Sequence, residues 1–232
     1  MAVVVWLFAG GGESEIRGLF PFLERNFPCD FQRKTPIRQK PGPRPSRPIE
    51  GLGRTGRSLA KQIELQLDSA LSSGDNCELI LVVDDLDCHD RAQRERLFLD
   101  FIEKFEGATG IQRLIGFAVP ELEAWIIADW NNTIAKDVDF RNCQRGMQRW
   151  LSTQRNVSFE TPETFSTYDS DRDSCAEKLS DAIVEAAFES SQRYSKAIHT
   201  PRLLMRANPQ TIQQKCPIFR DLYITLLRVC NP

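Results

Sequence analysis

The chain has 232 residues, of which 41% are hydrophobic and 27% are charged. This composition is typical of one globular domain, or of one domain with a small additional lobe, and it excludes disordered and fibrous proteins. No apolar run reaches the roughly 18–20 residues that a membrane span needs. The apolar residues 2–9 lack the basic flank of a signal peptide and read as a first strand. We therefore expect a cytoplasmic protein without membrane association.

A net charge of −2 hides a strongly basic strip. Nine basic residues and one acid lie from Arg33 to Lys61, whereas the rest of the chain carries 21 basic and 31 acidic residues. Five prolines interrupt the strip, which predicts an exposed, extended loop over residues 33–57. The loop is either simply solvated or a contact for the phosphate backbone of nucleic acid. The candidate contacts are Arg38, Lys40, Arg44, Arg47, Arg54 and Arg57.

The seven cysteines lie singly along the chain, with no Cys-x-x-Cys pair. Their odd number and their scatter argue against a disulfide framework and against a zinc ribbon, and they favour a reducing compartment. We expect these cysteines to be small buried side chains.

Strands and helices alternate in the first 130 residues. Apolar runs over residues 2–9, 78–83 and 113–119 are typical of buried parallel strands. Amphipathic helices are expected from Ser14 onward, over residues 59–71 and 97–105, and from Glu121. Pro21 predicts that the first helix is kinked or begins late. The fold class is therefore α/β, with a mostly parallel sheet flanked by helices over residues 1–130 and a mostly helical region over 131–232 that packs on it.

Carboxylates follow all three predicted strands. In an open α/β sheet, ligands bind outside the carboxyl ends of the strands. One such cluster would be explained by capping of the next helix, but three clusters at one edge repel each other unless a cation neutralises them. Mg²⁺ and Mn²⁺ suit such a site because they take oxygen ligands. In chain order the acids are Glu13 and Glu15, then Asp84, Asp85, Asp87 and Asp90, then Glu121 and Glu123.

Other motifs point to weaker alternatives. Residues 51–58 have the spacing of a phosphate-binding loop, but Arg57 stands at the lysine position and no strand precedes them, which leaves at most a phosphate contact at a helix start. The glycines at 10–12 lack the spacing of a dinucleotide-binding turn, so a nucleotide-binding protein is the least favoured alternative. His89 has no Cys/His pair at ligand spacing and reads as a loop histidine. Trp125 and Trp130 read as core aromatics.

Four segments carry a resemblance to a known family. They are Gly10-Gly11-Gly12-Glu13-Ser14-Glu15, Asp85-Leu86-Asp87, Pro120-Glu121-Leu122-Glu123-Ala124-Trp125, and Tyr194-Ser195-Lys196 with His199 and residues 216–220. With them the chain resembles, over nearly its whole length, the Toprim-like family of the RloB/AbiL type, the domain-of-unknown-function 4276 group. The resemblance implies a Toprim-like (Rossmann-like) fold and relatives that are metal-dependent nucleases, primases and topoisomerases. It also implies a phage-defence context and an AAA/ABC-type ATPase partner.

The resemblance implies roles for individual residues. Glu13, Asp85 and Asp87 would be catalytic, and the same three with Glu121 and Glu123 would hold Mg²⁺ or Mn²⁺. Lys196 and His199 would contact phosphate. The family's first strand usually ends in an acid, where this chain has Ala9.

Two functions follow from the sequence. One is a metal-dependent nuclease acting on DNA or RNA, and the other is a catalytically inactive adaptor or sensor that binds nucleic acid or an ATPase without cutting. The departure at Ala9 favours the second. The sequence leaves the oligomeric state open, with an isologous homodimer as one arrangement.

Overall fold

Four parallel strands form the central sheet of the computed structural model, in the order β2-β1-β3-β4. The structure describes residues 2–11, 13–35 and 55–231, without the side chains of residues 13–15. The strands are β1 (Val4–Ala9), β2 (Asp30–Arg33), β3 (Leu79–Asp85) and β4 (Gln112–Ala118). The predicted α/β class and its three apolar strands are confirmed. The short edge strand β2 was not predicted, because only one of its four side chains is buried and it has no apolar run.

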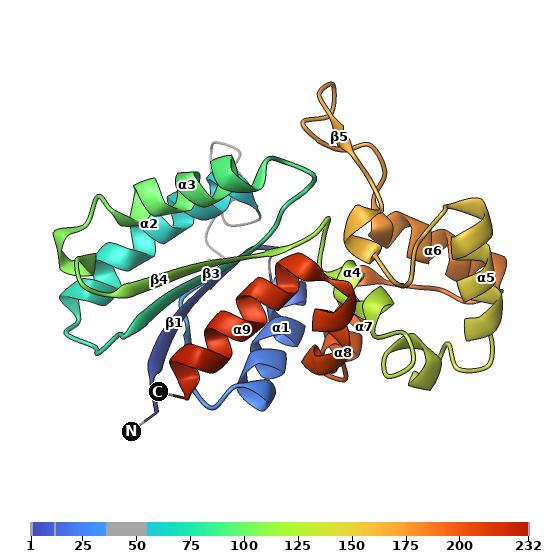
Figure 1. Ribbon diagram of the computed structural model, residues 1–232, viewed down its shortest axis with the longest axis horizontal. Coiled ribbons are helices and arrows are strands. Elements are labelled where there is room, and N and C mark those ends of the chain that lie inside the picture. Colours follow the sequence, from blue (N-terminus) through green and yellow to red (C-terminus); the bar gives the residue numbers. More distant parts are fainter. Residues whose placement is uncertain (1, 12, 36–54, 232) are drawn as a thin grey trace, which may run out of the picture.

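Helices cover both faces of this sheet (Figure 1). On one face lie α2 (Gly56–Ser72) and α3 (Arg91–Ile102), and on the other lie α1 (Glu13–Asn26) and α9 (Pro217–Cys230). Successive side chains of a strand point to opposite faces. Ile80 and Val82 therefore belong to the core under α2 and α3, whereas Leu79, Leu81 and Val83 belong to the core under α1 and α9.

Helix α1 crosses α7 (Lys196–Leu204) at very short range. A Cβ atom on Gly18 would lie 2.5 Å from Cα of Pro201, so this crossing requires a glycine. Helix α1 begins at Glu13 and continues past Pro21 to Asn26. The expectation that it begins late is wrong, because the apolar face formed by Ile16, Leu19, Phe22 and Leu23 is buried along its whole length and outweighs the one hydrogen bond that a proline cannot donate.

The remaining elements follow α3 along the chain, and the C-terminal part carries helices, as predicted. The helices are α4 (Glu123–Ala128), α5 (Gln144–Gln154), α6 (Leu179–Glu189) and α8 (Pro209–Lys215), with 3₁₀ turns at Glu106–Ala108, Ile134–Lys136 and Pro162–Thr164. Strands β5 (Tyr168–Asp169) and β6 (Ser174–Cys175) form a two-stranded antiparallel hairpin that projects from the body in Figure 1. Helix α9 packs back on β4, where a Cβ on Gly116 would lie 2.7 Å from Leu222 Cδ2.

Two disulfide bonds correct the expectation from the cysteine pattern. Cys29 pairs with Cys230, and Cys88 pairs with Cys175, with Cα–Cα distances of 5.3 and 5.1 Å. The partners are 201 and 87 residues apart in the sequence, so only the folded chain brings them together. Cys77, Cys143 and Cys216 are free thiols, and of these Cys216 is fully buried as expected.

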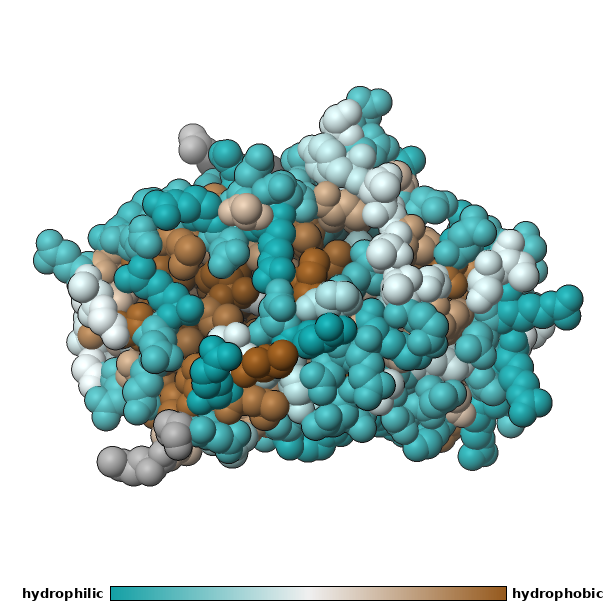
Figure 2. Space-filling model, viewed as in Figure 1, coloured by the Kyte–Doolittle hydropathy of each residue, from teal (hydrophilic) through white to brown (hydrophobic). Residues whose placement is uncertain are grey.

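The face of the molecule that Figure 2 shows is mostly polar, with an apolar band. Figure 2 shows hydrophobic residues gathered in the middle of the visible face, in the region where β4 lies between α3 and α9 in Figure 1. Over the described part of the chain, every helix is too short or too polar to cross a membrane.

Candidate functional site

Three predicted acids meet at the carboxyl ends of β3 and β4. These strands are neighbours, and Asp85 at the end of β3 lies opposite Ala118 at the end of β4. Asp85 Oδ1 accepts a hydrogen bond from the backbone N–H of Leu122 (3.0 Å), in the turn that carries Glu121 and Glu123 into α4. All three carboxylates are buried. The structure thus places Asp85 of the second acid cluster beside the two glutamates of the third.

Lys196 supplies the cation of this cluster. Its Nζ lies 3.1 Å from Glu121 Oε2 and 3.5 Å from Glu123 Oε2. Lys196 is the first residue of α7, so the close crossing of α7 with α1 fixes where its side chain starts. The side chain is 34% exposed, whereas those of the two glutamates are 5% and 0% exposed. The ammonium group therefore stands between buried carboxylates and the surface.

The two glutamates are also held by hydroxyl and backbone donors from distant helices. Glu121 accepts hydrogen bonds from the N–H (2.6 Å) and the Oγ (3.0 Å) of Ser180, at the start of α6. Glu123 Oε1 accepts one from Thr200 Oγ1 (2.7 Å), which is also hydrogen-bonded to the Tyr194 hydroxyl (2.8 Å). Glu123 Oε2 is buried and makes no hydrogen bond among the described residues. This oxygen faces the Lys196 ammonium group at 3.5 Å, so a cationic ligand would have to displace that group.

The electrostatics follow from burial. Loss of solvent raises the pKa of Glu123 to about 7 and raises the pKa of Asp85 well above its ordinary value, with the neighbouring acids adding to both effects. Burial alone would lower the pKa of Lys196, but the charges of Glu123, Glu121 and Asp85 outweigh it and raise that pKa. The cluster therefore favours a bound positive charge.

Asp84 points to the opposite face of the sheet from Asp85. Its Oδ2 accepts hydrogen bonds from the backbone N–H of Gly56 (2.9 Å) and from Arg94 Nη1 (3.3 Å), while Oδ1 is buried without a partner in the described structure. Burial raises the pKa of Asp84 to about 7. The carboxylate of Asp84 thus already occupies the start of α2, where the sequence suggested a bound phosphate.

Asp87 lies in the loop between β3 and α3. Asp87 and Cys88 both have left-handed backbones, with φ of 49° and 61°. Burial raises the pKa of Asp87. His89, after Cys88, is a loop histidine as predicted, and its ring is tilted against that of Tyr168 with centroids 5.1 Å apart. Asp90 caps α3 by accepting a hydrogen bond from Gln93 N (2.8 Å), as expected for an acid at a helix start.

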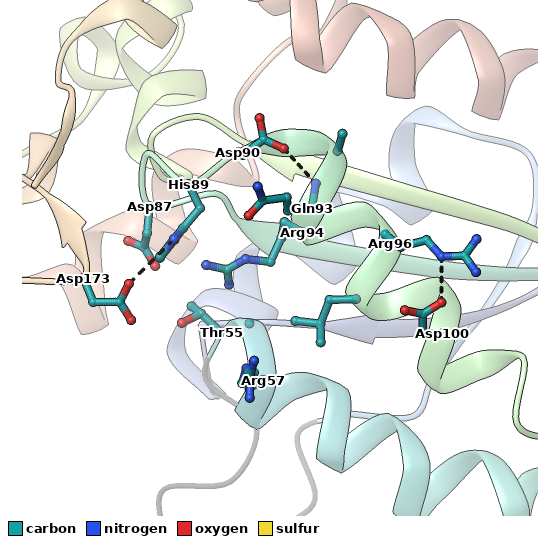
Figure 3. Close-up of a pocket in the computed structure, with 13 residues that line it drawn as sticks. Thr55, Arg57, Asp87, His89, Asp90, Gln93, Arg94, Arg96, Asp100 and Asp173 are labelled. Atoms are coloured by element: carbon teal, nitrogen blue, oxygen red, sulfur yellow. Dashed lines mark hydrogen bonds and ion pairs between the residues drawn. The ribbon is translucent and has the colours of Figure 1, made fainter. Parts of the chain in front are cut away.

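A groove of about 1020 Å³ begins at Asp87 and runs between α2 and α3. Figure 3 shows Asp87 and His89 at one end with Asp173 of the β5–β6 hairpin, and Arg96 with Asp100 at the other. Arg57, at the start of α2, is exposed and lines the groove. The groove reaches Asp87 beyond the carboxyl end of β3, whereas Asp85, Glu121 and Glu123 are not among its described lining residues.

His199 lies deeper than a phosphate contact would. Its ring packs against those of Phe140 and Tyr194, with centroids 5.0 and 5.2 Å away, and its Nε2 is 3.5 Å from Asp139 Oδ2. Arg202 of the same helix makes ion pairs with Asp137 and Asp139. His199 therefore belongs to a packed layer behind the acid cluster.

Several predicted residues fall outside the described part of the chain. They are the side chain of Glu13 and the basic residues Arg38, Lys40, Arg44, Arg47 and Arg54. At the end of β1, the methyl group of Ala9 is fully buried. Thr35 Oγ1 bonds both backbone groups of Ala9, at 2.6 Å from N and 3.1 Å from O.

The donors at the carboxyl edge fit a divalent metal in kind. Mg²⁺ and Mn²⁺ take carboxylate oxygens, and Glu123 Oε2 is a buried oxygen without a hydrogen bond. In the described residues, however, no three acidic, histidine or cysteine side chains are grouped so that they could hold one ion. A metal here would need Glu13 as a further ligand, or a displacement of the Lys196 ammonium group.

Sequence reasoning missed the donors that hold the acids. Ser180, Thr200 and Arg94 lie on three different helices, and no local motif marks them. The sequence says only that buried carboxylates need hydrogen-bond partners. Every polar residue of the chain could supply one, so this requirement does not identify these three.

Comparison with known proteins gives one finding. The model of the family described as "Domain of unknown function (DUF4276)" matches residues 35–227. Neither the curated proteins nor the solved structures contain a match to the chain. The matched span includes Asp85, Glu121, Glu123 and Lys196, so the family model covers the acid cluster that the fold assembles. This protein belongs to the DUF4276 family.

Proposed function

We propose that this protein hydrolyses phosphodiester bonds of DNA or RNA with the help of Mg²⁺ or Mn²⁺. The observation that carries the proposal is the meeting of Asp85, Glu121 and Glu123, all buried, at the carboxyl ends of two adjacent parallel strands. Buried carboxylates repel each other, so a fold that keeps them together needs a cation or a bound proton to balance their charge.

Asp85, Asp87, Glu121 and Glu123, with Glu13, would hold the ion. When bound, the ion would neutralise the charge that develops on the phosphodiester in the transition state. Ser180 and Thr200 orient the two glutamates through hydrogen bonds of 2.6–3.0 Å, which fixes their oxygens before any ligand arrives. Lys196 would turn its ammonium group toward the incoming phosphate once the ion takes its place.

The groove from Asp87 to Arg96 would receive the nucleic acid. Its described lining carries Arg57, Arg94 and Arg96 together with four aspartates, so contacts there would position the strand without reading its sequence. The basic residues of the strip, from Arg38 to Arg54, would add contacts to the backbone. The family resemblance further supports a role in phage defence together with an AAA/ABC-type ATPase.

The first test replaces Asp85 with asparagine. Asn keeps an oxygen for the Leu122 N–H, so the fold should survive, while the charge that attracts the ion is lost. Mn²⁺ binding by calorimetry should disappear, and cleavage of plasmid, single-stranded DNA or tRNA should fall by about 100-fold or more. Asp87→Asn should act likewise, and Asp75→Asn, an exposed acid, serves as the control. Full cleavage by Asp85→Asn with intact circular dichroism would contradict the proposal.

A second function is favoured by one specific observation. Lys196 already neutralises Glu121 and Glu123. The family resemblance, which implies an acid where this chain has Ala9, points the same way. A protein that binds nucleic acid or an ATPase partner without cutting needs no metal ion in the acid cluster, because Lys196 balances its charge. It would show salt-dependent DNA or RNA binding, or co-purification with the ATPase, but no Mn²⁺ binding by the wild-type protein.

A further inference from the structure

The Cys88–Cys175 disulfide connects the candidate site to the β5–β6 hairpin. Cys88 directly follows Asp87, and Cys175 ends β6, 87 residues later. The hairpin projects from the body in Figure 1, so it has little packing of its own to hold it in place. Its position relative to the site thus depends on a few specific contacts.

Two further contacts join the same partners. The His89 ring lies 5.1 Å from that of Tyr168, and His89 Nδ1 lies 4.0 Å from Asp173 Oδ1. Asp173 lines the groove beside Asp87 and His89, as Figure 3 shows. The hairpin therefore forms one end wall of the groove, and the disulfide is the only covalent link among these contacts.

The loop that contains Asp87 and Cys88 has an unfavourable backbone conformation. A left-handed conformation costs a residue with a Cβ about 1 kcal/mol or more, and Asp87 and Cys88 adopt it in succession. Asp87 N donates to Pro120 O (3.0 Å) and His89 N to Leu86 O (3.0 Å), which leaves Cys88 held through its side chain. Beyond β6 the chain reaches Ser180, which binds Glu121, so the segment that follows the hairpin contacts the acid cluster.

We propose that Cys88–Cys175 is a redox latch, whose reduction releases the β5–β6 hairpin and the Asp87 loop and so changes access to the groove. The link to catalysis rests on the proposed function, whereas the movement does not. Cys175 lines a second cavity of about 530 Å³, and Cys88 is partly exposed, so a reductant can approach the bond.

The chemistry is exchange with a dithiol. One thiolate of the dithiol attacks a cysteine sulfur, the Cys88–Cys175 bond breaks, and the other cysteine leaves as a thiolate that takes up a proton. The second thiol of the reductant then attacks the mixed disulfide and displaces the first cysteine. The protein bond gains two electrons and two protons, and the dithiol becomes a disulfide.

The second disulfide provides a matched control. Cys29 precedes β2 and Cys230 ends α9, at the end of the sheet where the strands begin, whereas Cys88 follows the carboxyl end of β3. Figure 1 shows the chain ends there, away from the projecting hairpin. Loss of the Cys29–Cys230 bond should leave the hairpin and the Asp87 loop unchanged.

The experiment compares amide hydrogen exchange in five samples: oxidised wild type, wild type with dithiothreitol, Cys88→Ser/Cys175→Ser, and Cys29→Ser/Cys230→Ser without and with dithiothreitol. Alkylation of free thiols before digestion establishes which bonds each sample contains. We expect exchange in residues 86–90 and 165–178 to rise by about tenfold or more in the second and third samples. The control pair should match the oxidised wild type in these segments and respond to dithiothreitol as the wild type does.

Cleavage and Mn²⁺ binding, measured on the same samples, separate the two proposals. Faster exchange with a changed cleavage rate supports both, and faster exchange without cleavage in any sample supports the latch while contradicting the nuclease. Unchanged exchange, or Cys88 and Cys175 alkylated in the untreated protein, would overturn the latch even where cleavage is strong.

Discussion

At the scale of single residues, Lys196 has the largest expected effect on stability. Removing one partner of a buried ion pair leaves the other charges without compensation, which costs about 3–5 kcal/mol. We expect Lys196→Met to lower the free energy of unfolding by about 3 kcal/mol at pH 8, measured by urea denaturation. At pH 5 the loss of unfolding free energy should be smaller, because Glu123 is protonated there.

Lys215→Met is the matched control. Lys215 Nζ lies 3.0 Å from Glu160 Oε1, and the Glu160 side chain is 79% exposed. Such a surface pair should contribute less than about 1 kcal/mol. Equal losses in the two variants would contradict the role of Lys196 as the counter-charge of the cluster.

Asp84 predicts a pH dependence of stability. Its pKa rises from 3.8 to about 7 on folding, so between these values the unfolded chain ionises first and stability falls as pH increases. The share of Asp84 in this fall should total about 2–4 kcal/mol, and Asp84→Asn should remove that share while Asp85 and Glu123 keep theirs. Urea midpoints from pH 4 to pH 8 measure this, with Asp75→Asn as a control. An unchanged slope in Asp84→Asn would assign the pH dependence to other groups.

At the scale of the elements, the crossing of α1 and α7 positions the ammonium group. Gly18→Ala would place a Cβ 2.5 Å from Pro201 Cα, so α7 must shift and carry Lys196 with it. We expect a loss of about 1–3 kcal/mol in thermal or urea unfolding.

Gly146→Ala provides the comparison within another helix. Its Cβ would meet only Ser190 Oγ at 3.5 Å, so the better helix propensity of alanine should make the change neutral or stabilising by up to about 1 kcal/mol. A loss as large as that of Gly18→Ala would show that the crossing with α7 is not the cause.

The elements also show how far the sequence reaches. The carboxyl ends of parallel strands lie at the same edge of a sheet, and this rule predicted that Asp85 lies near Glu121 and Glu123. The rule depends only on the order and the direction of the strands. It could not indicate Ser180, Lys196 or Thr200, which lie 59, 75 and 77 residues from the glutamates that they bind. Such partners are chosen by the packing of helices, which no local pattern encodes.

At the scale of the whole molecule, the Cys29–Cys230 disulfide closes nearly the entire chain. A cross-link over 201 residues limits the unfolded ensemble and typically stabilises the fold by about 2–4 kcal/mol. Cys29→Ser/Cys230→Ser should therefore lower the urea midpoint. Adding dithiothreitol to this variant should lower the midpoint only by the smaller contribution of the Cys88–Cys175 bond. Alkylation of Cys29 in the untreated protein would contradict this prediction.

The contacts of Glu121 and Glu123 bear on how the protein can be divided for study. A fragment that ends after Trp130 keeps both glutamates but loses Ser180, Lys196 and Thr200. It also loses α9, which covers β4. The two buried glutamates would then lack their hydrogen-bond donors, and β4 would be uncovered. The fragment would therefore expose apolar surface that favours aggregation, and its behaviour would not represent the site of the full chain. Dissection of this protein has to proceed by point substitution in the full chain.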